Sequence, residues 1–225
     1  MLINYIIFSN IFQIILLLST NNPTVTRNQF DGVETDEESY GLYISGCDGY
    51  TIEENEFNNG QAGLFVNAST ETGAEIYKNY FYNTVGTPTS QYNQAATVAL
   101  GSNTNLQYIC NKFDGNAFDI AVCDGGTIAD KQGNILKSAR NMFVTSTCPN
   151  GSNRIHRETD INDPNPISYI YYYNKNAIIT NPSGCVSGYI EPEEIPYDFD
   201  EETQCKSKIT NPVIPNPEKS LNFSF

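Results

Sequence analysis

A short phrase of strand-forming residues, an Asn, a variable residue and a Phe recurs along the first two thirds of the chain. Its three clearest copies span residues 24–30, 51–57 and 75–81, and two further copies end at Phe113 and Phe143. The Asn residues of successive copies are 27, 24, 32 and 30 residues apart. A period of this length is typical of a solenoid, in which each repeat forms one turn.

The recurring Asn and Phe predict two stacks of side chains. Asn tolerates the left-handed backbone conformation of a sharp turn better than most residues, and stacked Asn amides can hydrogen-bond to one another in a ladder. A Phe two residues later would point inward and stack on the Phe of the next coil. The expected Asn ladder and Phe stack consist of Asn28, Phe30, Asn55, Phe57, Asn79, Phe81, Asn111, Phe113, Asn141 and Phe143.

A second apolar element precedes the later phrases, at residues 41–44, 63–66, 97–100 and 119–122. These runs indicate a second strand in each coil, with Gly or small polar residues at the bends. The pattern predicts an all-β fold, namely a right-handed parallel β-helix. A leucine-rich repeat is the alternative, but it requires Leu-type residues five and eight positions before the Asn. The first coils have residues such as Pro23 and Glu71 there.

The repeat defines the domain organisation. The β-helix coils are expected over residues 1–148, because the phrase fades after Cys148 and most of the prolines follow it. Residues 149–190 include a strand-like run and are expected to form an irregular C-terminal cap or appendage. Residues 191–225 are acidic and rich in Pro, so we expect a solvated linker or tail.

The apolar start of the chain is also expected to be part of the solenoid. Residues 14–30 align without a gap with residues 41–57, and residues 7–12 contain a further copy of the phrase. A secretory signal sequence is the alternative, but no Lys or Arg precedes Arg27 and no Ala-x-Ala pattern is present. If these residues are coils, the chain is expected to be part of a longer protein.

Charge and cysteine content narrow the functional classes. The chain has 12 Lys and Arg against 26 Asp and Glu, a formal charge of −14, which disfavours nucleic acid and anionic membranes as partners. We expect no membrane span and a secreted or cell-surface protein. Six cysteines fit an oxidising compartment, although buried free thiols are an alternative. The expected disulfides join Cys110 with Cys123 or Cys148, and Cys185 with Cys205.

These phrases resemble a known group of proteins. Gly-Leu-Tyr-Ile at residues 41–44 and Ile-Glu-Glu-Asn-Glu-Phe at residues 52–57 resemble the β-helix repeats of the pectin-lyase-like superfamily. Residues 106–113, with 119–122 and 126–128, are similar to large secreted surface proteins of Bacteroidetes-type bacteria, which often end in a type IX secretion sorting domain. The resemblance covers about residues 1–148. It implies secretion and cell-surface display, and it implies no established activity.

The enzymatic alternative is a divergent polysaccharide lyase or glycoside hydrolase. Such enzymes need several acids on adjacent coils, and the lyases add calcium and a basic residue. Arg27, Glu54 and Lys78 precede the ladder Asn in three successive coils and are therefore the candidate catalytic residues. Ion pairing along one column explains them more simply. Enzymatic activity is thus left uncertain, with a non-catalytic protein favoured; calcium is implied only by the lyase alternative, and no other cofactor is expected.

The remaining candidate residues indicate binding rather than chemistry. The single histidine, His156, and the acidic residues at 34–38 and 191–194 are expected in solvated loops rather than in metal sites. Four aromatic residues could stack on sugar rings if they face outward, although an aromatic stripe in a solenoid more often belongs to the core: Tyr43, Phe65, Tyr77 and Tyr80. We therefore expect a non-catalytic module for adhesion, glycan contact or display, with an extracellular glycan or a surface protein as its partner.

Overall fold

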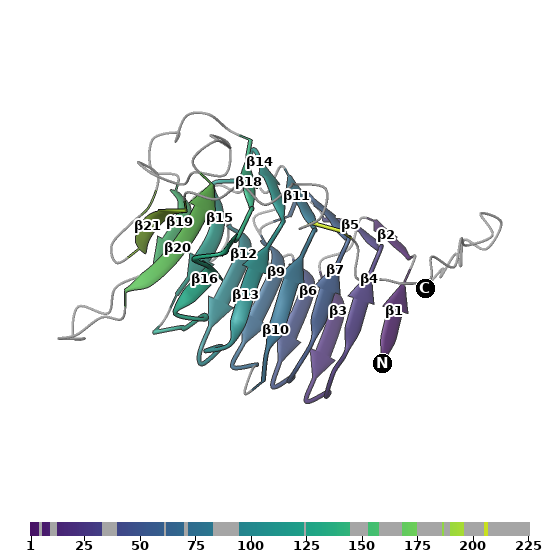
Figure 1. Cartoon of the computed structure of the whole chain (residues 1–225). Helices are drawn as coiled ribbons and strands as arrows, with labels where there is room; N and C mark the ends of the chain where they lie inside the picture. The colour runs from purple at the N-terminus through teal and green to yellow at the C-terminus, as the bar shows by residue number, and fades with distance from the viewer. Residues whose placement is uncertain are drawn as a thin grey trace.

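The molecule is a right-handed parallel β-helix, as the repeat predicts (Figure 1). The computed structural model describes residues 1–4, 6–9, 13–32, 40–60, 62–69, 72–82, 95–123, 125–144, 153–157, 168–174, 186, 190–195 and 205–206. These residues form strands β1 to β21. None of the described residues belongs to a helix long and apolar enough to cross a membrane.

Each full coil contributes one strand to each of three parallel sheets. The first sheet contains β1 (Leu2–Asn4), β4 (Thr24–Thr26), β7 (Thr51–Glu53), β10 (Ala74–Tyr77) and β13 (Leu106–Ile109). The second sheet contains β2 (Ile7–Ser9), β5 (Gln29–Asp31), β8 (Glu56–Asn58), β11 (Tyr80–Tyr82), β14 (Lys112–Asp114) and β18 (Met142–Phe143). The third sheet contains β3 (Gln13–Leu18), β6 (Tyr40–Ser45), β9 (Ala62–Asn67), β12 (Ala95–Leu100), β15 (Phe118–Val122) and β19 (Asn153–Arg157).

The expectation of two strands per coil was wrong, because the recurring phrase contains two strands rather than one. In the second phrase, β7 ends at Glu53 and β8 begins at Glu56, so Glu54 and Asn55 form the corner between the first and second sheets. Glu54 has a φ of 54°. A residue in this left-handed region turns the chain out of the first sheet, which ends the strand.

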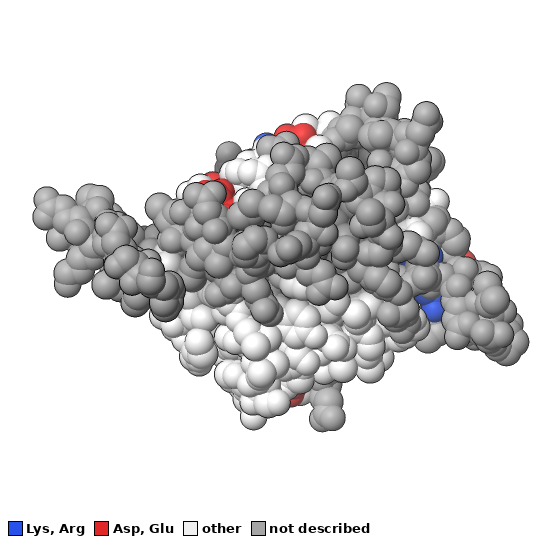
Figure 2. All heavy atoms as spheres, turned by 180° about the vertical axis from the view of Figure 1, so that it is seen from behind, with Lys and Arg blue, Asp and Glu red and all other residues white. Residues whose placement is uncertain are grey.

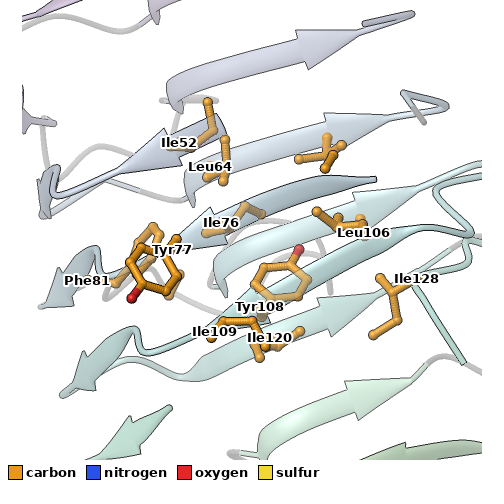
Figure 3. Packing of buried hydrophobic residues seen from close by; sticks show 14 of the residues in the cluster. Ile52, Leu64, Ile76, Tyr77, Phe81, Leu106, Tyr108, Ile109, Ile120 and Ile128 are labelled. Carbon is orange, nitrogen blue, oxygen red and sulfur yellow. The ribbon is translucent and has the colours of Figure 1, made fainter. Parts of the chain in front are cut away.

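The Phe residues of the phrase stack inside the helix. The rings of Phe30 and Phe57 lie 4.6 Å apart, and those of Phe57 and Phe81 lie 4.7 Å apart, in both cases nearly parallel. These separations match the distance of about 4.8 Å between neighbouring strands. The stack continues through Phe113 and Phe143, and all five rings are buried. Aliphatic side chains of the first sheet, such as Ile52 and Ile76, fill the rest of the core together with Leu64 and Ile120 of the third (Figure 3).

The first thirty residues contribute β1 to β5 to the same three sheets. In the third sheet, Ile15 lies beside Leu42 and Leu16 beside Tyr43, which is the register of the gapless sequence alignment. The copy of the phrase assigned to residues 7–12 was misaligned. Phe8, not Phe12, is the residue that pairs with Phe30, because β2 spans Ile7–Ser9. Residues 10–12 lie outside the described part of the chain.

Parallel strands continue beyond the expected boundary at residue 148. Strand β19 extends the third sheet, and a fourth sheet contains, in order, β17 (Lys137–Ser138), β16 (Lys131–Asn134), β20 (Tyr169–Asn174) and β21 (Ile190–Ile195). The side chain of Gln132 joins this sheet to the first, because its Oε1 accepts from the Tyr108 N–H (2.8 Å) and its Nε2 donates to the Leu106 carbonyl (3.0 Å).

Strand β21 lies in the segment that was expected to be a solvated linker. Ile190 and Ile195 are buried at its two ends, whereas the Glu residues between them are exposed. Pro192 is accommodated because β21 is the edge strand of the described fourth sheet, where a missing N–H is tolerated. An acidic, Pro-containing segment therefore forms a strand here because its two end residues are apolar.

Candidate functional site

A column of left-handed residues runs along the corner between the first and second sheets. Its members precede the ladder Asn in successive coils and have φ values of 53° to 60°: Arg27, Glu54, Lys78, Cys110 and Arg140. We expected the Asn itself to adopt this conformation, and that expectation was wrong. The Asn side chain is instead used for hydrogen bonds inside the corner, so the residue before it makes the turn. We call these five residues the corner column.

The three candidate catalytic residues lie together in the corner column, as mutual ion pairs. Arg27 Nε lies 2.7 Å from Glu54 Oε2, and Lys78 Nζ lies 2.9 Å from Glu54 Oε1. Both oxygens of the Glu54 carboxylate are therefore engaged by neighbouring coils. The side chains of Arg27 and Glu54 are each 18% exposed and that of Lys78 is 39% exposed. This geometry is that of a structural charge column on the outside of a solenoid.

We expect Glu54→Gln to reduce the free energy of unfolding by about 1 kcal/mol or less, because the pairs are partly exposed to solvent. The loss should shrink as salt is raised from 0.05 M to 1 M, since salt screens such pairs. Urea unfolding at both salt concentrations measures it, with Glu56→Gln, an exposed carboxylate on β8, as the matched control. A loss that does not depend on salt would contradict the ion-pair assignment.

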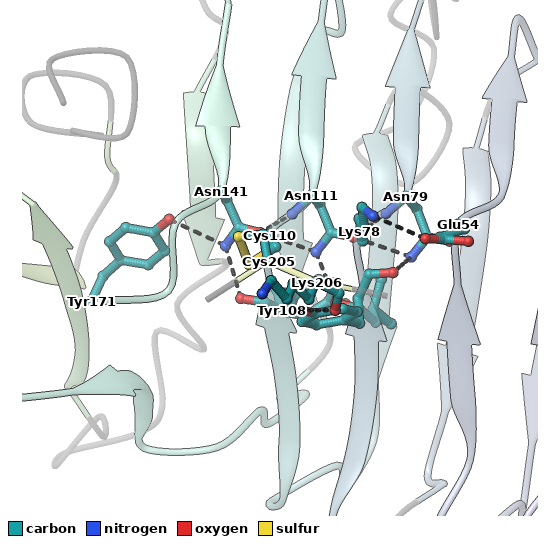
Figure 4. Close-up of a disulfide and its surroundings, with 12 residues drawn as sticks. Glu54, Lys78, Asn79, Tyr108, Cys110, Asn111, Asn141, Tyr171, Cys205 and Lys206 are labelled. Carbon is teal, nitrogen blue, oxygen red and sulfur yellow. Dashed lines mark hydrogen bonds and ion pairs between the residues drawn. A yellow bond between two sulfur atoms is a disulfide. The ribbon is translucent and has the colours of Figure 1, made fainter. Parts of the chain in front are cut away.

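Inside the corner, the Asn residues form a continuous ladder (Figure 4). The N–H and the Nδ2 of Asn28 both donate to Asn55 Oδ1, at 2.9 and 3.0 Å. Asn55 donates in the same way to Asn79, Asn79 to Asn111, and Asn111 to Asn141. All five are buried, with exposed fractions of 2% or less. The ladder ends at the fourth sheet, where Asn141 Nδ2 donates to the hydroxyl of Tyr171 (3.1 Å).

A disulfide and a hydrogen bond hold Cys205 and Lys206 against the corner. Cys110 of the corner column is bonded to Cys205, with their Cα atoms 5.8 Å apart (Figure 4). The hydroxyl of Tyr77 donates to the carbonyl oxygen of Lys206 at 2.8 Å. Burial, together with the carboxylates of Glu53, Glu75 and Glu54, raises the pKa of Tyr77 to about 12. Tyr77 therefore stays protonated as a donor over the physiological pH range.

The expected disulfide pairs were wrong for Cys110 and Cys205, which are bonded to each other across a sequence separation of 95 residues. The expectation relied on sequence proximity, whereas the corner column points Cys110 outward to a distant segment. Cys123 is a buried cysteine that is not disulfide-bonded. It follows β15 and packs with residues of the third sheet, away from the corner. Cys148 and Cys185 lie outside the described residues.

The outward side chains of the second sheet form an accessible polar and aromatic surface. They lie on both sides of the inward Phe of each strand, in two rows that run from coil to coil. We call this surface the second-sheet face, and its residues are Gln29, Glu56, Tyr80 and Lys112 in one row and Asp31, Asn58, Tyr82 and Asp114 in the other. All eight side chains are exposed or half-buried. Sequence reasoning missed Tyr82. Side chains alternate between the two faces of a strand, so the alternation places Tyr82 on the outer face with Tyr80, on the other side of the inward Phe81.

Contacts along the second-sheet face link neighbouring coils. The rings of Tyr80 and Tyr82 stack 4.5 Å apart, and Lys112 Nζ lies 4.1 Å from the centre of the Tyr80 ring. The hydroxyl of Tyr80 donates to Asp114 Oδ2 (3.2 Å). In the second row, Asn58 Nδ2 donates to Asp31 Oδ1 (3.3 Å). Burial raises the pKa of Tyr82, and the nearby carboxylates of Glu56 and Asp31 also raise it.

The outer face of the third sheet differs, because its middle strands bury Phe65, Val98 and Ala121, whereas Leu16 and Leu18 on β3 are exposed. Tyr43 and Phe65 stack 5.0 Å apart, and Phe65 is only 7% exposed. Figure 2 views the molecule from behind, where the described surface is mostly free of charged side chains. His156 lies on β19 rather than in the expected solvated loop, with its ring 5.0 Å from that of Phe118. Of the four aromatic candidates for sugar stacking, Phe65 and Tyr77 are buried, whereas Tyr43 and Tyr80 are half-buried. Tyr43 stacks on the buried Phe65, and Tyr80 stacks on Tyr82, which is itself half-buried.

A second polar column lies at the corner between the third and first sheets, and sequence reasoning missed it. Ser69 Oγ donates to the carbonyl of Asn67 (2.9 Å), and its N–H donates to Asn103 Oδ1 (3.0 Å). Cys47 occupies the equivalent place one coil earlier, where its thiol donates to the carbonyl of Ser45 (3.6 Å). Cys47 and Ser69 each lie two residues after a strand of the third sheet, and this shared spacing was the sequence signal for the column. Cys47 therefore replaces a hydroxyl in a structural corner.

Three parallel sheets, a buried Asn ladder and a stacked Phe core define the class of protein, a right-handed parallel β-helix. The chain matches the family model described as "Periplasmic copper-binding protein (NosD)" over residues 2–116, which is more than half of its length, and it belongs to this family. No curated protein and no solved structure matched the chain. The periplasmic family and the Cys110–Cys205 disulfide together indicate an extracytoplasmic protein.

Proposed function

We propose that this chain is a non-catalytic β-helix module of a cell-surface or secreted protein, and that it contacts a glycan. The observation that carries the proposal is the second-sheet face, an accessible surface on which polar and aromatic side chains recur from coil to coil. Such a surface can contact successive residues of a linear polymer, because the coils are about 4.8 Å apart. Display at the surface of a Bacteroidetes-type bacterium through type IX secretion belongs to the same proposal.

The corner column supports binding rather than catalysis. A general acid or base must reach the substrate, yet both oxygens of Glu54 are bonded to Arg27 and Lys78. Arg27 and Lys78 are both held by the Glu54 carboxylate, so neither is an isolated cation aimed at a developing negative charge. The divergent lyase or hydrolase is the alternative, and it would have to break these pairs to act.

The test uses the whole chain with neutral and uronate-containing polysaccharides, with and without calcium. Affinity electrophoresis measures retention, and assays for reducing and unsaturated ends measure cleavage. We expect retention by at least one polysaccharide and no new ends from any of them. New ends that disappear in Glu54→Gln would establish the enzymatic alternative, and a lack of retention by every polysaccharide would contradict glycan contact.

The family description also raises copper binding. Thiolate, thioether and imidazole groups are the ligands that copper prefers. Within the described ranges, no three His, Cys, Asp or Glu side chains gather where they could hold a metal ion. Cys47 and Cys123 belong to different apolar clusters, and the ring of His156 packs on Phe118. The described residues do not fit a copper centre, so the proposal contains no copper-dependent step.

A further inference from the structure

The second-sheet face carries a more specific inference, which rests on the proposed function. We propose that it binds neutral glycans, with Tyr82 and Tyr80 as the stacking platform and the flanking amides and carboxylates as partners for sugar hydroxyls. This site lies on the outer face of the second sheet, beside the corner column and on a different sheet from the stacked Tyr43 and Phe65.

The aromatic pair provides the apolar contact that a sugar ring needs. Tyr80 and Tyr82 stack on each other with their rings 28° from parallel, and both side chains are half-buried rather than enclosed. The C–H groups on one side of a pyranose ring form a weakly polar surface that packs well on an aromatic face. The Lys112 side chain, which lies over Tyr80, is long and flexible and can move aside when a sugar is bound.

The polar residues around the pair suit hydroxyl groups. On one side of Tyr82 in its row lie Asn58 on β8 and, one strand further, Asp31 on β5. On the other side lies Asp114 on β14. Carboxylate oxygens accept hydrogen bonds from hydroxyls, and an amide both donates and accepts. Because these groups recur at the spacing of the coils, a linear glycan laid across the strands would meet a new set of partners at each coil.

The charge of the face selects against acidic glycans. It includes three carboxylates, those of Asp31, Glu56 and Asp114, and one ammonium group, that of Lys112. The chain as a whole carries a formal charge of −14. A polyuronate or a sulfated glycan would therefore be repelled both at the face and at long range, whereas a neutral glycan would not.

The experiment measures how strongly each polysaccharide retards the whole chain in affinity electrophoresis. The neutral polysaccharides are mannan, β-glucan and dextran, and the acidic ones are polygalacturonate and alginate. The chain should bind a neutral polysaccharide. The affinity should fall about tenfold in Tyr82→Ala, because this variant loses one stacked ring. Tyr82→Phe should retain most of the affinity because it keeps the ring. The matched control is Tyr43→Ala, which removes a half-buried Tyr from the third sheet and should leave binding unchanged. Circular dichroism and thermal unfolding verify the fold of each variant.

The outcomes separate this inference from the proposed function. Neutral-glycan binding that survives in the Tyr80→Ala Tyr82→Ala double variant, or that is lost equally in Tyr43→Ala, would overturn the site and leave glycan contact standing. Binding only to polygalacturonate or alginate would overturn the neutral-glycan assignment and also leave glycan contact standing. A lack of binding to every polysaccharide would overturn both.

Discussion

Asn79→Ala is expected to reduce the free energy of unfolding by about 3 to 5 kcal/mol, as one of the most damaging single changes in the chain. Asn79 Oδ1 accepts from the N–H and the Nδ2 of Asn55, both at 3.0 Å. Its Nδ2 donates to the carbonyl of Ile52 (2.8 Å) and to Asn111 Oδ1 (3.1 Å). Alanine would leave these groups without their partner in a corner where the side chain is 1% exposed.

Urea unfolding followed by circular dichroism measures this loss. The matched control is Asn58→Ala, one coil earlier, because Asn58 is half-buried and donates to Asp31 at 3.3 Å. We expect the control to cost about 1 kcal/mol or less, the usual effect of a surface substitution. Equal losses in the two variants would contradict the view that the ladder, rather than Asn content, stabilises the coils.

Loss of the Cys110–Cys205 disulfide is the second large expected effect. The bond closes a loop of 95 residues, for which the stabilisation is about 2 to 5 kcal/mol, since a cross-link restricts the unfolded chain. Cys205→Ser removes it without changing the left-handed position of Cys110. We expect a lower melting temperature and greater proteolysis near Lys206, because the segment then loses its covalent link to the corner and keeps the weaker hydrogen bond from Tyr77.

Reductant provides an internal check of this prediction. Dithiothreitol should lower the melting temperature of the wild-type chain by at least the difference between the wild-type chain and Cys205→Ser, and it should lower that of the variant by less. Cys47→Ala is the matched control, because Cys47 is a buried cysteine that is not disulfide-bonded. Its melting temperature should still fall on reduction. If reductant left the wild-type chain unchanged, the disulfide would contribute nothing to stability.

The repeat in the sequence was sufficient to predict the β-helix, because the ladder position requires Asn and the stacked core position requires Phe in successive coils. Phe57 and Phe81 recur two residues after a ladder Asn, and their rings are stacked in the structure. The number of strands per coil was not predictable in the same way. The left-handed conformation of Glu54 divides one apolar phrase into two strands, and Glu has no strong preference for that conformation.

Contacts between distant segments left no signal in the sequence. The partner of Cys110 lies far beyond the repeats, so a rule based on proximity selected the wrong cysteines. The columns were easier to predict, since residues at the same place in successive coils become neighbours. Arg27, Glu54 and Lys78 were found this way, and Tyr82 would have been found by applying the two-residue alternation to Tyr80 and Phe81.

The measurement that tests glycan contact on the second-sheet face most directly is hydrogen–deuterium exchange with and without the retained polysaccharide. We predict slower exchange in peptides that contain β8, β11 and β14, with no cleavage of the glycan during the experiment. Slower exchange confined to the strands of the third sheet, or new reducing ends in the glycan, would contradict a non-catalytic contact at this face.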